Sequence, residues 1–218
     1  MDSLFTVYVV LLLSITLVGF IRYKKLNDSF RILTILILCT LVSETIKKFY
    51  GRIYHNSMPL AHLWSVIEFA LFSVVYYKFI TADVIKKIII ILIPAMLILE
   101  IFNIRFFEQL SQFPSLILEA SHIIYVVYAL VLFRQMLFSP AEESLFKQSL
   151  FWFNINMLFY ATTMFLNFAL LSYFIENKLD VAPLVYISVV VNFIFYIVIG
   201  VSLLIDNKRP DTIKIANG

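Results

Sequence analysis

Seven long apolar stretches, separated by short polar segments, run through the chain. They cover roughly 3–21, 31–50, 60–79, 85–103, 114–137, 148–174 and 183–205. A helix needs about 20 apolar residues to cross the hydrocarbon core of a bilayer. The pattern therefore predicts an all-α polytopic membrane protein, a bundle of seven transmembrane helices. These helices use most of the chain, so we expect one domain over residues 1–218.

The basic residues collect in alternate connections between these stretches. On one side of the predicted membrane lie Arg22, Lys24, Lys25, Arg31, Lys78, Lys86, Lys87, Arg134, Lys147, Lys208, Arg209 and Lys214. The other side has only Lys47, Lys48, Arg52, Arg105 and Lys178. Positive residues favour the cytoplasmic side of a membrane protein. This asymmetry predicts an N-terminus outside and a cytoplasmic C-terminus.

Composition agrees with a membrane protein and excludes an ordinary soluble domain. Hydrophobic residues make up 62% of the chain and charged residues 14%, against roughly a quarter charged in soluble domains. The formal charge of +3 reflects the loops and indicates no nucleic-acid partner. The first stretch lacks a basic leader and a small-residue cleavage site, so we expect it to remain as a helix. The polar tail after Ile205 is too short for an effector domain, so we expect any signal to pass to a separate membrane or cytoplasmic partner.

Three of the stretches share a pattern of proline followed by a polar residue. Pro59, Pro114 and Pro183 stand at the beginning of the third, fifth and seventh stretches. Eight or nine positions later come Glu68, His122 and Asn192. At about 1.5 Å per residue, all three lie about 12–14 Å below the outer surface. They are therefore expected at one depth, in the outer half of the bundle.

The neighbouring helices supply further polar groups near this level. An ionisable side chain in hydrocarbon costs about 2.5–3.5 kcal/mol, so such residues face the bundle interior and are functional candidates. We therefore predict an outward-facing cavity that holds a small polar ligand or cation. Its expected ligand-binding residues are Glu44, Glu68, Glu119, His122, Asn167 and Asn192.

Several of these candidates have a purely structural alternative. Glu44 precedes Lys47 and Lys48 by three and four residues, which suits an ion pair within one helix. Asn167 and Asn192 belong to polar stripes on the sixth and seventh helices, which suit hydrogen bonds between helices. His62 and Glu100 are expected nearer the outer rim, His62 at the membrane interface and Glu100 as a rim residue. The stripes are Asn156, Tyr160, Thr163 and Asn167, and Ser188, Asn192 and Tyr196.

Glu119 and His122 have the Glu-x-x-His spacing that carboxylate-bridged metal sites use in helical bundles. The second such motif that a di-iron site needs is missing. A single divalent metal such as zinc, held by His122, Glu119 and Glu68, agrees better with these ligand types. The alternative is a hydrogen-bonded Glu119–His122 pair that holds the bundle together. The cofactor stays open between none and such a metal.

The run Phe151-Trp152-Phe153-Asn154 through Leu158-Phe159-Tyr160, together with His62, Glu68 and the Glu119-x-x-His122 motif, resembles a set of small bacterial seven-helix membrane proteins. The resemblance extends over most of the chain. It implies a multi-pass protein of the bacterial cytoplasmic membrane, and it implies no activity.

Three functions follow as hypotheses from these patterns. The first is a ligand- or cation-binding sensing subunit that contacts a partner chain. The second is a metal-dependent hydrolase of a lipid ester or amide, in which His122 and carboxylates bind zinc and Glu68 or Glu119 acts as the base. The third is a proton- or cation-coupled transporter, which needs an inner polar pathway for which the sequence offers little beyond Asn154, Asn156 and Thr162.

Overall fold

The computed structural model describes residues 2–138 and 145–207, and these ranges are almost entirely helical. Seven α-helices follow one another in the order α1 Asp2–Arg22, α2 Asp28–Tyr54, α3 Met58–Phe79, α4 Asp83–Phe106, α5 Ser115–Phe138, α6 Ser149–Glu176 and α7 Ala182–Ile205. Two short 3-10 turns, Tyr23–Lys25 and Leu145–Lys147, lie before α2 and α6. Each helix matches one apolar stretch of the sequence to within about four residues at either end, a usual margin for helix boundaries.

Six of the seven helices are long and apolar enough to cross a membrane, namely α1, α2, α3, α5, α6 and α7. Large apolar side chains cover the outside of the bundle; Ile88, Ile91 and Ile98 of α4 are examples. A soluble protein seldom exposes such a continuous apolar surface. The fold is thus that of an all-helical protein suited to an integral membrane position.

The helix ends follow from local sequence. Pro59 and Pro183 occupy the first turns of α3 and α7, where a missing backbone N–H costs nothing. Pro114 directly precedes α5. The sequence Ser139-Pro140-Ala141-Glu142 has the pattern of a helix start, and it lies outside the described residues.

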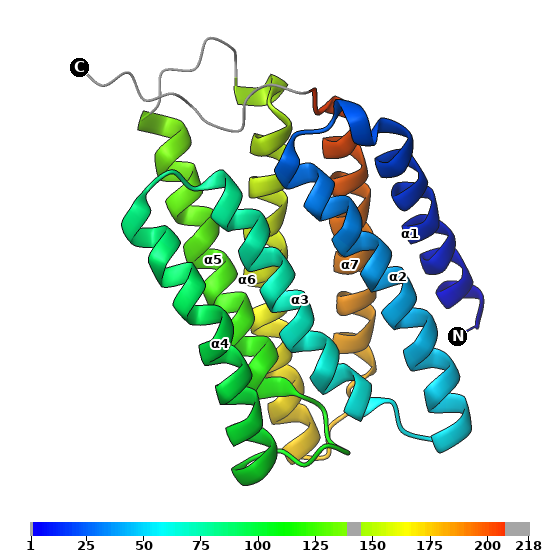
Figure 1. The fold of residues 1–218 in the computed structure, drawn as a ribbon. Helices are drawn as coiled ribbons and strands as arrows, with labels where there is room; N and C mark the ends of the chain where they lie inside the picture. Colours follow the sequence, from blue (N-terminus) through cyan, green and yellow to red (C-terminus); the bar gives the residue numbers. More distant parts are fainter. Residues whose placement is uncertain (1, 139–144, 208–218) are drawn as a thin grey trace.

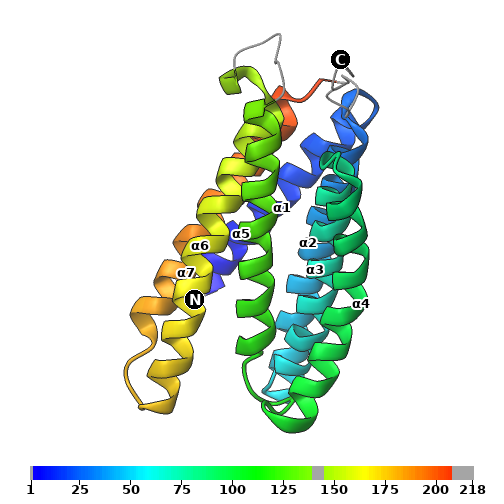
Figure 2. The same ribbon diagram turned by 90° about the vertical axis from the view of Figure 1, so that its left-hand side faces the viewer.

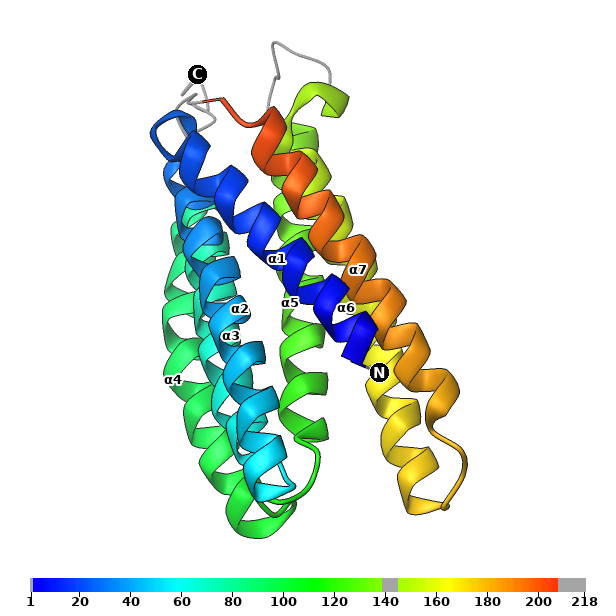
Figure 3. The same cartoon turned by 90° about the vertical axis from the view of Figure 1, so that its right-hand side faces the viewer.

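The helices lie side by side in one bundle (Figure 1), in which α5 and α1 join two groups. Figure 2 shows α2, α3 and α4 on one side, α6 and α7 on the other, and α5 between them. Helix α5 packs mainly on α6 and also touches α3 and α4. Helix α1 crosses the bundle obliquely and packs on both α2 and α7 (Figure 3). The interior between α3, α5 and α6 is therefore the meeting place of the two groups.

Aromatic side chains fill much of this interior. Tyr76, Phe30 and Phe153 are almost fully buried, and Phe153 lies 5.8 Å from Tyr76 and 6.1 Å from Phe30 between ring centroids. Asn154 donates to the backbone oxygen of Ala129 and accepts from the Tyr76 hydroxyl. These contacts fix α6 against α3 and α5 at the end of the bundle that carries the α1–α2 connection.

Candidate functional site

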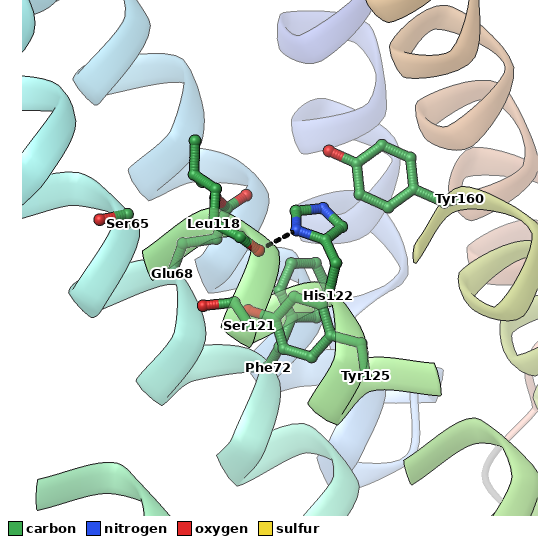
Figure 4. A pocket seen from close by; sticks show the side chains of 8 residues that line it. All are labelled: Ser65, Glu68, Phe72, Leu118, Ser121, His122, Tyr125 and Tyr160. Atoms are coloured by element: carbon green, nitrogen blue, oxygen red, sulfur yellow. Dashed lines mark hydrogen bonds between the residues drawn. The ribbon is translucent and has the colours of Figure 1, made fainter. Parts of the chain in front are cut away.

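A small cavity lies between α3, α5 and α6, and Glu68 and His122 both line it (Figure 4). The volume open to the centre of a water molecule is about 10 Å³, enough for about one water-sized occupant. Its other polar lining residues are Ser65, Ser121, Tyr125 and Tyr160, and its apolar walls are Phe72 and Leu118. Two residues predicted at one depth from separate helices thus share one cavity.

His122 is held firmly and keeps one nitrogen free. Its side chain is 4% exposed, and its Nδ1 lies 2.7 Å from the backbone oxygen of Leu118. The rings of Tyr125, Tyr160 and Phe168 surround the imidazole at centroid distances of 5.3–5.6 Å. Its Nε2 is buried and has no hydrogen-bond partner among the described residues. Six other buried side-chain atoms in the described residues also lack a partner, but only His122 Nε2 belongs to a residue that lines the cavity.

Glu68 comes from the middle of α3 and is partly buried. No hydrogen bond to its carboxylate is found within the described part of the chain. Glu44 and Lys47 of α2 lie close enough to Glu68 to interact with it electrostatically. Lys47 already pairs with Glu44, at 2.6 Å between Nζ and Oε1. The intrahelical ion pair expected for Glu44 is therefore present, and it leaves Glu68 as the carboxylate that faces the cavity.

Asn192 and Asn167 lie behind the cavity, where they connect α6 to α7. The Tyr160 hydroxyl donates to Asn192 Oδ1 at 3.3 Å, and Asn192 Nδ2 donates to the backbone oxygen of Ser188. Asn167 Nδ2 donates to Ser188 Oγ at 2.6 Å and to the backbone oxygen of Leu184. Both side chains thus act as interhelical hydrogen-bonding groups, and Asn192 reaches the cavity through Tyr160.

Glu119 does not line the cavity. Its Oε1 lies 3.5 Å from Ser172 Oγ on α6, and the hydrogen-bonded Glu119–His122 pair that was considered does not form. His122 bonds instead to the backbone of its own helix. No group of three or more His, Cys, Asp or Glu that suits a metal ion is found in residues 2–138 and 145–207. The metal set of His122, Glu119 and Glu68 stays a prediction.

A second polar group lies near the α4–α5 connection, close to the helix ends at which His62 and Glu100 were expected, and the structure shows in addition that both side chains are buried. His62 is 1% and Glu100 is 4% exposed, and His62 Nδ1 lies 2.5 Å from Glu100 Oε1. His62 Nε2 lies 3.1 Å from the backbone oxygen of Gln112. Asn103 donates to both Glu100 and Glu108. The pair is buried because the 107–114 connection folds back over it and supplies the Gln112 carbonyl.

Glu108 extends this group to α5. Its Oε1 accepts hydrogen bonds from the Ser115 hydroxyl and from the backbone N–H of Leu116, in the first turn of the helix. A carboxylate at a helix N-terminus satisfies donors that have no partner within the helix. Sequence reasoning had no signal for this contact, because it depends on the path of an irregular connection.

Asp206, directly after α7, is a further residue that the sequence analysis missed. Its carboxylate accepts hydrogen bonds from the Asn27 backbone N–H at 2.8 Å, the Asn27 side chain at 3.1 Å and the Ser149 hydroxyl at 2.7 Å. Arg22 donates to the backbone oxygens of Asp206 and Leu203. Burial raises the pKa of the Asp206 carboxyl, while the hydrogen bonds from Asn27 and Ser149 and the charge of Arg22 oppose that rise. The group joins the ends of α1, α2, α6 and α7.

Comparisons with protein-family models, curated proteins and solved structures gave no match for this chain. The resemblance inferred from the sequence therefore gains no support from them, and the functional argument rests on the cavity.

Proposed function

We propose that this protein is an integral membrane protein that binds a small polar ligand or cation in the cavity between α3, α5 and α6. The observation that carries the proposal is the buried His122 Nε2, which has no partner among the described residues and shares its cavity with Glu68. A buried polar atom left without a partner costs about 1–3 kcal/mol. A bound ligand that reaches this nitrogen would remove that cost.

The orientation proposed for the protein has the N-terminus outside and the C-terminus in the cytoplasm, with all seven helices spanning a bacterial cytoplasmic membrane. The positive residues in the α1–α2 connection and in the helix ends beside the α3–α4 connection support it. The cavity then lies in the outer half of the bundle, and we expect it to be reached from outside. A sensing role follows if the cytoplasmic basic connections contact a partner protein.

Cysteine labelling tests this orientation. In a Cys39→Ser background, Gln109→Cys should react with a membrane-impermeant maleimide in intact cells. Lys25→Cys should react only after the membrane is opened. The reverse pattern would contradict the proposed orientation.

The binding proposal is tested by thermal unfolding of the purified protein with a panel of small polar compounds and ions. At least one compound should raise Tm in the wild type, and Glu68→Gln should remove that rise. Glu176→Gln, at the exposed end of α6, makes the same chemical change away from the cavity and should keep it. Failure of every compound, or an unchanged rise in Glu68→Gln, would count against a binding role for this cavity.

A further inference from the structure

Most of the hydroxyl groups that line the cavity already donate a hydrogen bond to another group of the protein. Ser65 Oγ donates to the backbone oxygen of His62 at 2.8 Å, and Ser121 Oγ donates to that of Ile117 at 2.7 Å. The Tyr160 hydroxyl donates to Asn192. Each of these oxygens therefore offers only lone pairs to an occupant. Among the lining hydroxyl groups in the described chain, only that of Tyr125 donates its hydrogen to no such acceptor.

His122 also presents a lone pair. A backbone carbonyl only accepts hydrogen bonds, so the Nδ1 that contacts Leu118 carries the hydrogen. In a neutral imidazole the other nitrogen, Nε2, is then an acceptor. A charged ring at this position would be buried with an unpaired N–H, which costs more than the neutral form. The buried nitrogen without a partner is thus a hydrogen-bond acceptor.

The charges around the cavity leave one negative charge unpaired. The electrostatic neighbours Glu44, Lys47 and Glu68 sum to one negative charge when all are ionised. Lys47 is held by Glu44, and Tyr8 of α1, Tyr160 of α6 and Tyr196 of α7 add only neutral hydroxyl groups around the two carboxylates. A monovalent cation in the cavity would balance the Glu68 carboxylate.

The lining also distinguishes between kinds of cation. Alkali and alkaline-earth ions favour shells of oxygen ligands and gain little from an imidazole nitrogen. Zinc-like ions favour imidazole but need about three protein ligands, and no group of three or more His, Cys, Asp or Glu that could supply them is found in residues 2–138 and 145–207. A cation with N–H donors satisfies the nitrogen, the hydroxyl oxygens and the carboxylate together, because each is an acceptor.

We propose that the ligand of this cavity is a small monovalent cation that donates N–H hydrogen bonds, of the size of ammonium. This inference rests on the proposed function, whose ligand class it specifies. The volume of about 10 Å³ open to the centre of a water molecule admits one such ion. It excludes tetramethylammonium, which has the same charge but is much larger and has no N–H group.

The test is thermal unfolding of the full-length protein with ammonium chloride, sodium chloride, potassium chloride, zinc chloride, tetramethylammonium chloride or glycine, at constant ionic strength. Ammonium at ten times its Kd should raise Tm by about 4 °C, and the other additives should not. Glu68→Gln and His122→Leu should each weaken ammonium binding at least tenfold, since one removes the charge and the other removes the nitrogen acceptor. Glu176→Gln should bind ammonium as the wild type does.

Two results separate failure of this inference from failure of the binding proposal. If another additive raises Tm through Glu68 and ammonium does not, the ligand class is wrong and the cavity remains a binding site. If no additive in the panel raises Tm, both are wrong. If sodium raises Tm as much as ammonium does, or if ammonium still raises Tm in Glu68→Gln, the ligand class is wrong. The comparison of ions in the wild type decides this even if a variant does not fold.

Discussion

The two buried histidines differ in whether their second nitrogen is satisfied. His62 contacts Glu100 through Nδ1 and the Gln112 carbonyl through Nε2. Because the carbonyl only accepts, Nε2 carries a hydrogen, and one further proton lies between Nδ1 and the carboxylate. The pair is then neutral as a whole in either arrangement, which suits a buried position. His122 has only one of its two nitrogens satisfied, so it is the histidine available to a ligand.

Replacement of Glu100 tests the structural role of the first histidine. Glu100→Leu leaves His62 Nδ1 without a partner and removes one of the two hydrogen bonds that the Asn103 amide donates. We therefore expect the free energy of unfolding to fall by about 3 kcal/mol. Glu100→Gln keeps hydrogen-bonding capacity at both places and should lose clearly less. Chemical denaturation of the purified variants measures both values. Equal losses in the two variants would show that the buried hydrogen bonds do not stabilise the protein.

For single residues, the sequence predicted the depth of a side chain in the bundle better than it predicted which side chains that residue contacts. Glu68 and His122 lie at matched distances behind Pro59 and Pro114, so a regular helical rise was enough to place them at one level. The His62–Glu100 contact could not be predicted in that way. It joins residues on two helices, and its burial depends on the course of residues 107–114, for which hydrophobic periodicity gives no information.

Among the elements, α1 is the helix whose position depends most on a small residue. A Cβ atom added to Gly19 would lie 2.5 Å from Thr34 Cγ2 and 2.6 Å from Thr34 Oγ1 on α2. Gly200 of α7 faces Ile15 of α1 in a similar but looser contact, at 3.2 Å. Glycine thus lets α1 approach both of its neighbours closely. The scarcity of glycine in the chain does not exclude such contacts, because a single glycine is enough at each crossing.

Gly19→Ala should therefore destabilise the protein by about 1–3 kcal/mol through overpacking. Thr34→Ala in the same chain removes both of the closest atoms and should restore part of the loss. Gly51→Ala is the control, since its Cβ atom would meet Ser57 at an ordinary 3.4 Å. Denaturant unfolding of the wild type and these three variants is the measurement. A Gly19→Ala protein as stable as Gly51→Ala would contradict the close contact of α1 and α2.

The helix ends around Asp206 should give the stability a dependence on pH. Because burial raises the folded-state pKa of this carboxyl above its unfolded value, its contribution to stability is present below the unfolded pKa and is lost as pH rises through the folded pKa. The Tm of the wild type minus the Tm of Asp206→Asn should thus be more positive at pH 5 than at pH 8. A difference that grows with pH would have the wrong sign.

For the whole molecule, the sequence predicted the class and the helix order, because seven apolar stretches leave few alternatives to a helical bundle. Which helices pack together was not encoded in the pattern. The central place of α5 between the two helix groups (Figure 2) brings His122 to the cavity that Glu68 lines, while Glu119 faces Ser172 of α6 outside it. The oblique course of α1 (Figure 3) was likewise not encoded in the pattern. Glu68, His122 and Glu119 were all candidates in the sequence, and periodicity alone could not tell which of them meet.

The central claim is that the Glu68 carboxylate of α3 and the His122 Nε2 of α5, which carries no hydrogen, line one cavity. Side-chain ¹⁵N NMR of His122, assigned with a His122→Leu sample, tests it most directly. We predict a neutral ring with the hydrogen on Nδ1 and none on Nε2, and a changed Nε2 signal in Glu68→Gln but not in Glu176→Gln. A hydrogen on Nε2, or a His122 signal that does not respond to Glu68→Gln, would contradict the account.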